Sequence, residues 1–163
     1  MKSIRACVFC CETLRARNQI IYEVKSFYTR TISSCYDNDA QVVAILDHNP
    51  RAKKHVLVIS REHIPFVDSL TPAHSHLLEH MLTMGKEILA NDGFVDEENR
   101  RFGFHRSYFA SIPHLHMHCL GLPFLRPWDH LRYTESFLPS YICAESALAA
   151  LRTKQDTLDT TDD

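Results

Sequence analysis

Three histidines at alternate positions are the residues in this chain best suited to chemistry. His114, His116 and His118 occur in the stretch PHLHMHCL, with an apolar residue after each one. A period of two is typical of a β-strand that turns its histidines to one face and its apolar residues to the core. Neutral imidazole is a nucleophile, a proton carrier and a metal ligand near pH 7. The histidine face therefore predicts a functional site, with an ordinary solvated strand face as the less favoured alternative.

The spacing along such a strand limits what the three histidines can do together. Neighbouring histidines of the triplet lie about 6.6 Å apart and the outer two about 13 Å apart. One metal ion binds imidazole nitrogen at about 2.0–2.1 Å, so a single ion cannot hold all three unless the strand bends sharply. We therefore expect separate roles. One phosphate group can contact His116 and His118, while His114 faces a different partner.

Composition fits one intracellular globular domain. The chain has 163 residues, 45% of them hydrophobic, and a net charge of −2, which favours neither nucleic acid nor a membrane surface as partner. No apolar run approaches the length of a membrane span, and the opening residues lack the apolar stretch of a signal peptide. We therefore expect a cytoplasmic protein, with the nucleus as a second compartment. Its six cysteines are then expected to be reduced, and metal binding or burial explains them better than disulfides.

The pattern along the chain predicts an antiparallel α+β domain. One amphipathic helix is expected near residues 72–90, beginning at Thr71-Pro72 and ending at Asn91-Asp92-Gly93. Because the strands precede and follow this helix without repeated βαβ units, they are expected to pair antiparallel. The strands are expected at residues 20–26, 41–47, 55–60, 101–105 and 114–121.

The C-terminal part is expected to extend this domain. We assign residues 1–152 to one domain, with an extension that starts at about residue 123 and contains a helical stretch at 144–151. Residues 153–163 have too few apolar side chains to pack, so they are expected to form a disordered tail.

The motif His114-Leu115-His116-Met117-His118-Cys119-Leu120 resembles the signature of the histidine triad (HIT) superfamily. The resemblance covers roughly residues 5–122, including a C-x-F-C motif at residues 7–10 and a segment at residues 47–64. Residues 102–105, 111–114 and 141–153 are similar to the histidine triad nucleotide-binding protein 3 group, which are adenosine 5′-monophosphoramidases. This implies a HIT-like fold, in which an antiparallel sheet carries one main amphipathic helix, plus a C-terminal extension.

The resemblance also implies a role for each histidine of the predicted site. His116 matches the nucleophile that forms a covalent nucleotidyl-histidine intermediate in the family. His118 matches the histidine that contacts phosphoryl oxygens or helps the leaving amine depart. His55 matches the histidine that supports the triad from a neighbouring strand.

Two further residues match the nucleotide-binding positions of the family. Ser111 matches a serine that contacts the phosphate, and Asp47 matches an acidic residue that binds the ribose hydroxyls. A turn-entering aspartate is an equally good interpretation of Asp47. The chain departs from the family in two places. Phe109-Ala110 replaces the usual Gly-Gln before the serine, which puts the geometry of the phosphate loop in doubt, and Ser60-Arg61 replaces the usual Pro-Lys.

A structural zinc site is expected beside the catalytic histidines. Two cysteines spaced C-x-x-C can bind one zinc ion, and tetrahedral coordination then needs two more ligands. The resemblance implies the set Cys7, Cys10, His63 and His114. The alternative is a pair of reduced thiols that pack beside Phe9.

The function that the resemblance implies is hydrolysis of the P–N bond in adenosine 5′-phosphoramidates, with release of AMP. The substrate would be a purine nucleotide conjugate, and the protein is expected to be a homodimer that pairs through helices and strands. A monomer whose residues 123–152 fold back over the same surface is the alternative. Rival functions are an aprataxin-like DNA-adenylate hydrolase, cleavage of dinucleoside polyphosphates, and a nucleotide-binding interaction module with little turnover. The near-neutral charge disfavours the DNA substrate.

Overall fold

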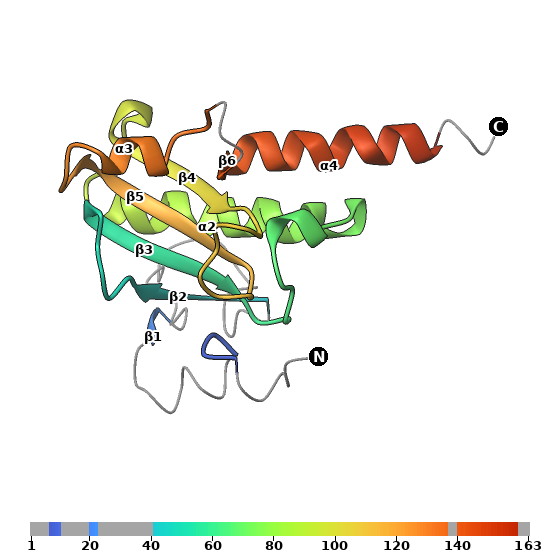
Figure 1. The fold of residues 1–163 in the computed structure, drawn as a ribbon, viewed down its shortest axis with the longest axis horizontal. Coiled ribbons are helices and arrows are strands. Elements are labelled where there is room, and N and C mark those ends of the chain that lie inside the picture. Colours follow the sequence, from blue (N-terminus) through green and yellow to red (C-terminus); the bar gives the residue numbers. More distant parts are fainter. Residues whose placement is uncertain (1–6, 11–19, 23–40, 137–139, 160–163) are drawn as a thin grey trace, which may run out of the picture.

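The computed structural model describes residues 7–10, 20–22, 41–136 and 140–159. Within them, the strands form one antiparallel sheet in the order β1-β2-β3-β5-β4-β6 (Figure 1). The predicted α+β fold is confirmed. The predicted strands after the first agree with the structure to within a few residues, whereas residues 23–26 of the first lie outside the described residues. The strands are β1 Ile20–Tyr22, β2 Val42–Leu46, β3 Ala52–Ser60, β4 Arg100–His105, β5 His116–Phe124 and β6 Tyr141–Cys143.

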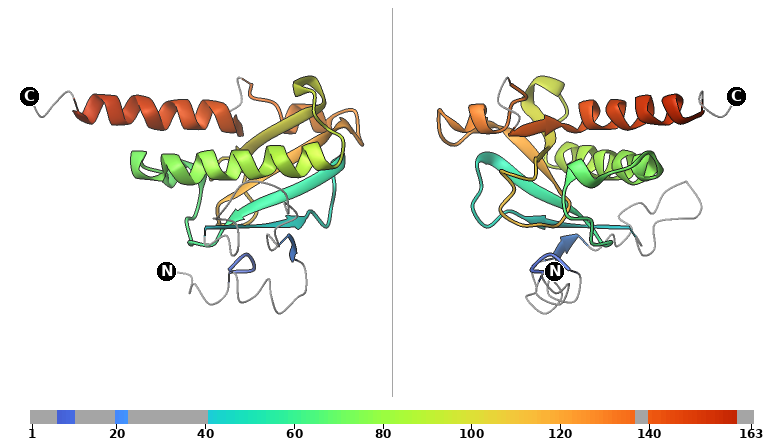
Figure 2. Two further views of the ribbon diagram at one scale, coloured as in Figure 1. Left: turned by 180° about the vertical axis from the view of Figure 1, so that it is seen from behind. Right: turned by 45° about the vertical axis from the view of Figure 1, so that its right-hand side comes forward.

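The predicted amphipathic helix is α2, Ser75–Asn91, which lies across one face of the sheet (Figure 2). A short 3₁₀ turn at Pro72–His74 precedes it, so the helical segment begins where Thr71-Pro72 predicted. Neither this helix nor any other described helix is long and apolar enough to cross a membrane. The buried side of α2 carries its apolar stripe: Leu77, Leu78, Met81, Leu82, Met84, Gly85, Ile88 and Leu89.

The sheet has apolar side chains on both faces. Towards α2, alternate residues of the central strands such as Val58, Met117 and Cys119 are fully buried in the main core. The opposite face carries a second cluster, formed by Phe9, Val43, Ile45, Leu57 and Ile59. Alternation along β3 and β5 therefore separates a core face from a face that carries the histidines.

The C-terminal extension folds back onto the domain. β6 pairs with the outer edge of β4, with Gly103 opposite Cys143. Helix α4, Ala144–Asp159, then runs beside α2 (Figures 1 and 2). Its buried Ala147, Leu148 and Leu151 join the main core. The extension therefore covers the edge of β4 and packs against the main core beside α2.

The prediction of a disordered tail at 153–163 is wrong for its first seven residues. Residues 153–159 form the last turns of α4, whose length exceeds the predicted helical stretch. Residues 153–157 are exposed, so the helix continues there without burial. Thr153 donates to the carbonyl of Ala149, and Thr157 donates to that of Lys154. Residues 160–163 lie outside the described residues.

Candidate active site and metal centre

The three histidines lie on or beside the central strand β5, and all of them are buried. His114, His116 and His118 are 1%, 8% and 5% exposed. β3 flanks β5 on one side and β4 on the other. Leu115 and Met117 point to the opposite face and enter the main core. The predicted alternation of histidines and apolar residues is therefore present. The face of the sheet that carries the histidines is buried rather than open to solvent.

His116 has the hydrogen-bonding pattern of a neutral nucleophile. Its Nδ1–H donates to the backbone carbonyl of His114, with 2.6 Å between Nδ1 and the oxygen. A carbonyl oxygen only accepts, so the proton sits on Nδ1 and Nε2 keeps its lone pair. Burial lowers the pKa of His116, which keeps the ring unprotonated near pH 7. Its free Nε2 is then available to attack an electrophile.

A chain of hydrogen bonds fixes the proton positions of His55 and His118. The backbone N–H of Arg51 donates to Nδ1 of His55 at 3.3 Å. The hydrogen of His55 must therefore be on Nε2, which lies 2.9 Å from Nδ1 of His118. His118 accepts there, so its own hydrogen is on Nε2. This Nε2–H is buried and has no partner among the described residues. It is a donor that a phosphoryl oxygen can satisfy.

His105 is a fifth buried histidine, beside His55, His114, His116 and His118, and the sequence assigned it no role. It ends β4, and its ring centroid lies 4.8 Å from that of His118. Burial lowers the pKa of both His55 and His105 to about 4. The pKa of His118 is also well below its usual value, because of burial and its histidine neighbours. The signal that could have found His105 is its place at the end of the strand next to the triad strand.

The two predicted nucleotide-binding residues are placed differently. Asp47 follows β2 and reaches the site, because its Oδ2 lies 3.4 Å from Nε2 of His55. Its Oδ1 also accepts the N–H of Asn49 at 2.8 Å, so Asp47 closes the turn after β2 and lies beside His55 at the same time. Ser111 is exposed in the loop between β4 and β5. Its neighbours Ala110 and Ile112, rather than Ser111 itself, line a small cavity beside His116.

The loop with the unusual Phe109-Ala110 pair is held at its start by Asp68. The backbone N–H of Ser107 donates to Oδ2 of Asp68 at 3.0 Å, and Arg106 forms an ion pair with Oδ1. The N–H groups of Phe109 and Ala110 both donate to the carbonyl of Arg106, which makes a tight turn. The altered loop is therefore a defined turn attached to the segment before α2.

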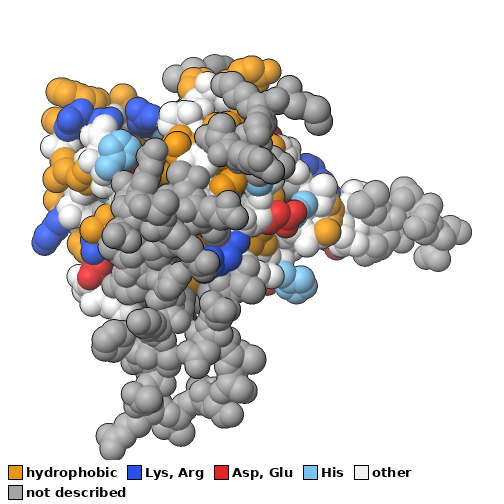
Figure 3. Space-filling view, turned by 90° about the horizontal axis from the view of Figure 1, so that it is seen from below, with side chains coloured by type: hydrophobic (Ala, Val, Ile, Leu, Met, Phe, Trp, Pro, Cys, Tyr) orange, Lys and Arg blue, Asp and Glu red, His pale blue; other side chains and the backbone are white. Residues whose placement is uncertain are grey.

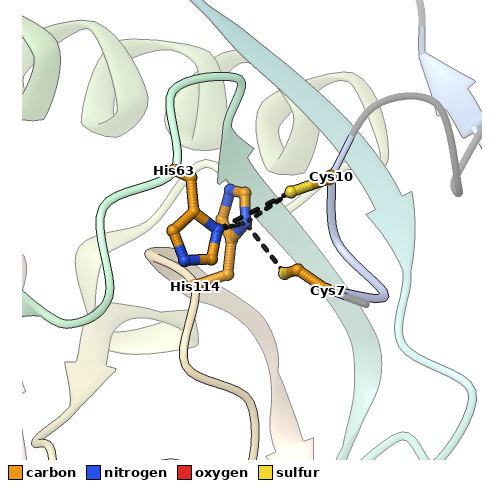
Figure 4. A group of neighbouring side chains, drawn as sticks. All are labelled: Cys7, Cys10, His63 and His114. Carbon is orange, nitrogen blue, oxygen red and sulfur yellow. Dashed lines mark hydrogen bonds between the residues drawn. The ribbon is translucent and has the colours of Figure 1, made fainter. Parts of the chain in front are cut away.

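The predicted zinc ligands come together in one group (Figure 4). Cys7 and Cys10 lie in the N-terminal segment, His63 follows β3, and His114 precedes β5. Sγ of Cys7 is 3.2 Å from Nδ1 of His114, and Sγ of Cys10 is 3.6 Å from Nδ1 of His63. The two Nδ1 atoms are 3.2 Å apart. The fold thus places Cys7 and His114, which are 107 positions apart in the chain, in contact.

These distances fit a tetrahedral metal site. With Zn–N near 2.05 Å and Zn–S near 2.3 Å, tetrahedral angles place two nitrogens about 3.3 Å apart and a nitrogen and a sulfur about 3.6 Å apart. Orientation fits as well. Nε2–H of His114 donates to the carbonyl of Ser60 at 2.6 Å, so the lone pair of Nδ1 faces the other three ligand atoms. Burial lowers the pKa of His114, which favours the neutral form that binds a metal.

Comparison with known proteins identifies the family. The sequence profile of the family described as "Scavenger mRNA decapping enzyme C-term binding" matches residues 6–134. The match spans most of the chain and includes the histidine face and the Cys/His group. The chain belongs to the HIT family.

The relatives of this HIT protein include named enzymes. An Arabidopsis thaliana protein named "Bifunctional adenosine 5'-phosphosulfate phosphorylase/adenylylsulfatase HINT4" is 34% identical over 151 residues, covering 91% of this chain and 92% of that protein. "Adenosine 5'-monophosphoramidase HINT3" from Xenopus tropicalis is 36% identical over 84 residues, 52% of this chain and 55% of that protein. A solved HIT family hydrolase from Clostridium thermocellum has a TM-score of 0.56 and 27% identity, covering 77% of this chain and 97% of that one. The relatives support a hydrolase.

Proposed function

We propose that this HIT protein hydrolyses AMP conjugates at the α-phosphorus, with the P–N bond of adenosine 5′-phosphoramidates as a substrate. The observation that carries the proposal is the hydrogen bond from Nδ1–H of His116 to the carbonyl of His114. It leaves a neutral, buried imidazole with a free Nε2, which is the form that attacks phosphorus. The HINT3 relatives named as adenosine 5'-monophosphoramidases support the choice of substrate.

The reaction would proceed in two displacements. Nε2 of His116 attacks the α-phosphorus, a P–N bond to the histidine forms, and the P–N bond to the amine breaks. The departing amine takes up a proton, and Nε2–H of His118 is the buried donor that can supply it or bind a phosphoryl oxygen. Water then attacks the phosphorus, the bond to His116 breaks, and AMP and free histidine result. Asp47, beside His55, is the residue proposed to bind the ribose hydroxyls.

Zinc at Cys7, Cys10, His63 and His114 is part of the proposal. Four protein ligands fill a tetrahedral ion, so the metal would stabilise the fold and would not activate water. It would hold the N-terminal segment against the end of β5 and thereby fix the carbonyl of His114, to which His116 donates.

The decisive experiment traps the intermediate. Wild type, His116→Asn and the control His76→Asn are mixed with adenosine 5′-phosphoramidate, and intact mass and AMP release are measured. His76 is exposed on α2, away from the site. We expect an added AMP mass and turnover in wild type and in the control, and neither in His116→Asn. Turnover by His116→Asn at the wild-type rate would contradict the mechanism. Binding of AMP without turnover in wild type would favour the interaction module.

The same assay tests the rival substrates. Adenylated DNA and a dinucleoside polyphosphate are added to the panel, and we expect slower turnover of both. On the visible part of the face shown in Figure 3, some Lys and Arg side chains lie near one another at the upper left, and the others are scattered among acidic and apolar ones. The net charge of −2 gives the DNA backbone little electrostatic attraction. Faster turnover of adenylated DNA than of the phosphoramidate would overturn this ranking.

The homodimer and the cytoplasmic or nuclear location are separate proposals. Because β6 covers the edge of β4 and α4 covers the side of α2, a homodimer of this chain would use another surface. Light scattering at micromolar concentration tests it. A mass of about twice 18.9 kDa supports the dimer, and a mass near 18.9 kDa contradicts it.

A further inference from the structure

Cys7 and Cys10 lie at the two ends of one turn, which brings their backbones close enough for a disulfide. The N–H of Cys10 donates to the carbonyl of Cys7 at 3.3 Å, the bond that closes a β-turn. The Cα atoms at the ends of such a turn lie less than about 7 Å apart, and a disulfide needs about 4.4–6.8 Å. The two Sγ atoms lie within 4.8 Å of each other. Rotation about the two Cα–Cβ bonds can therefore join the sulfurs.

These two thiols are also the cysteines best placed to react with an oxidant in the part of the chain that the structure describes. Both are half-buried, and their sulfurs face imidazole nitrogens in the proposed zinc group (Figure 4). A zinc-bound cysteine is a thiolate, which is the form that peroxides oxidise. Cys119 is fully buried, and burial raises the pKa of its thiol. Burial and the nearby Glu135 raise the pKa of the Cys143 thiol. Oxidation is therefore expected first at residues 7 and 10.

The turn that carries the two cysteines lies against the nucleophile. Phe9, inside the turn, is 8% exposed, and its ring packs edge-on against His116 with 5.2 Å between centroids. A second route runs through His114. Its Nδ1 lies 3.2 Å from Sγ of Cys7, and its backbone carbonyl accepts the Nδ1–H of His116. A change at the sulfurs can therefore reach His116 through a ring contact and through a hydrogen bond.

We propose that Cys7 and Cys10 are a modification site, at which a peroxide forms a reversible disulfide that releases zinc and slows the histidine site. The loss of turnover rests on the proposed function, whereas the disulfide does not. One thiolate attacks an oxygen of hydrogen peroxide, which gives a sulfenic acid and hydroxide. The second thiolate attacks that sulfur, the S–S bond forms and hydroxide leaves. The two sulfurs are oxidised, the peroxide is reduced, and two protons from solvent convert both hydroxides to water.

A disulfide removes both sulfur ligands at once. The remaining ligands, His63 and His114, are too few for a closed tetrahedral site, so the ion is expected to leave. The turn is then no longer held to these two histidines, and the ring of Phe9 is free to shift against His116. Loss of contacts that orient a reacting group typically lowers activity by about 10-fold to 100-fold.

The test uses the Cys11→Ser chain, because residues 7, 10 and 11 share one tryptic peptide, residues 6–15. In this chain a disulfide within the peptide joins Cys7 to Cys10. Zinc-loaded protein is treated with hydrogen peroxide. The peptide mass, zinc release to a colorimetric chelator, AMP release from adenosine 5′-phosphoramidate and the ¹⁵N shifts of His116 are measured. We expect a peptide lighter by two hydrogens, about one zinc released per chain, changed His116 shifts and about 10-fold slower turnover. Dithiothreitol followed by zinc should reverse all four changes.

Two further variants serve as controls in the same Cys11→Ser chain. Cys143→Ser removes a thiol outside the pair, so the response to peroxide should be unchanged. Cys7→Ser removes one sulfur of the pair, so peroxide should no longer change the turnover that this variant retains. A further fall in Cys7→Ser would show that peroxide acts on other residues, and it would overturn the inference.

The remaining outcomes separate this inference from the proposed function. A peptide that gains oxygen instead of losing two hydrogens would overturn the inference, and so would a protein that binds no zinc. A disulfide that leaves the zinc content, the His116 shifts or the turnover unchanged would overturn it too. Reduced protein that does not cleave the phosphoramidate would overturn the proposed function. The peptide mass, the zinc release and the ¹⁵N shifts would then decide the inference alone.

Discussion

Asp129, the first residue of α3 (Asp129–Arg132), and Arg51, just before β3, form a buried ion pair with 3.6 Å between Oδ1 and Nη1. Both backbone polar groups of Arg51 form hydrogen bonds. Its N–H donates to Nδ1 of His55, and its carbonyl accepts the N–H of Leu125 at 2.8 Å. Leu125 and Asp129 both belong to the C-terminal extension. The extension therefore holds Arg51, the residue whose N–H sets the proton position of His55 and, through His55, that of His118.

Removal of the Asp129 carboxylate should destabilise the protein and slow turnover. Asp129 is 3% exposed, so Asp129→Ala leaves the guanidinium of Arg51 partly buried without its counter-charge. We expect the free energy of unfolding to fall by about 2–3 kcal/mol. Urea unfolding measures this, with Glu79→Ala as the control because Glu79 belongs to an exposed pair with Arg152. Equal stability of the two variants would show that the Asp129–Arg51 pair contributes nothing.

The hydrogen-bond chain predicts a tautomer for each histidine of the site. His55 and His118 should carry hydrogen on Nε2, whereas His116 should carry it on Nδ1. ¹⁵N chemical shifts of the imidazole nitrogens distinguish these forms at neutral pH. The exposed His76 should show averaged shifts and serves as the reference. If His116 carried its hydrogen on Nε2, it could not be the nucleophile in the form described above.

Stability should fall on acidification because the buried histidines of the site, His55 and His105 among them, resist protonation. The pKa of His55 and of His105 is about 4 in the folded protein, against 6.5 for an ordinary histidine. Between these values the unfolded chain binds more protons than the folded one, so stability rises with pH in this window and levels off above it. Each histidine contributes a slope on the order of 1 kcal/mol per pH unit.

His105→Asn provides the measurement of this slope. Free energies of unfolding are compared at about pH 5 and about pH 7 for wild type and variant. The variant lacks one of the buried imidazoles with a lowered pKa, so its stability should depend less on pH. An identical pH dependence in both proteins would contradict the neutral, buried state of His105.

Protein purified without chelators should contain about one zinc ion per chain. Cys7→Ser removes one thiolate from the group and should lower both the zinc content and the Tm. Cys143→Ser is the control, because Cys143 is a half-buried thiol on β6 outside the group. Chelation should lower the Tm of wild type and have less effect on Cys7→Ser. A metal-free wild type with the same Tm before and after chelation would exclude the zinc site.

The sequence predicted those features that depend on local periodicity and motif spacing. Alternation in PHLHMHCL placed His116 on the face opposite Met117, and both lie where the pattern predicted. The convergence of Cys7 with His114 rested on the resemblance to the HIT superfamily, since no local rule joins residues 107 positions apart.

The features that the sequence left unpredicted depend on tertiary contacts. His105 is a single histidine at a strand end, and only the pairing of β4 with β5 brings its ring to His118. Asp129 lies in a helix of four residues, too short to give a periodic signal. The length of α4 was underestimated because its polar last turns include no buried residue among 152–157, so no apolar stripe marks them.

Gly103 on β4 provides a test of whether β6 is a firm part of the sheet. A Cβ at this position would overlap with the carbonyl oxygen of Ile142 and the ring of Tyr141, both on β6. Because a paired backbone carbonyl cannot move without its strand, Gly103→Ala should displace β6 and lower the free energy of unfolding by about 1–3 kcal/mol. Tyr141 packs against His105, so turnover should fall as well.

The comparison is Gly85→Ala on α2, where the added Cβ meets side-chain atoms of Cys119 and Met117 at 2.7 and 2.9 Å. The terminal methyl of Met117 can shift, whereas Sγ of Cys119 can move only by rotation about its Cα–Cβ bond. Because no backbone atom is in the way and alanine gains about 1 kcal/mol over glycine in a helix, Gly85→Ala should cost less than Gly103→Ala. A Gly103→Ala variant as stable and active as wild type would show that β6 does not hold the edge of β4.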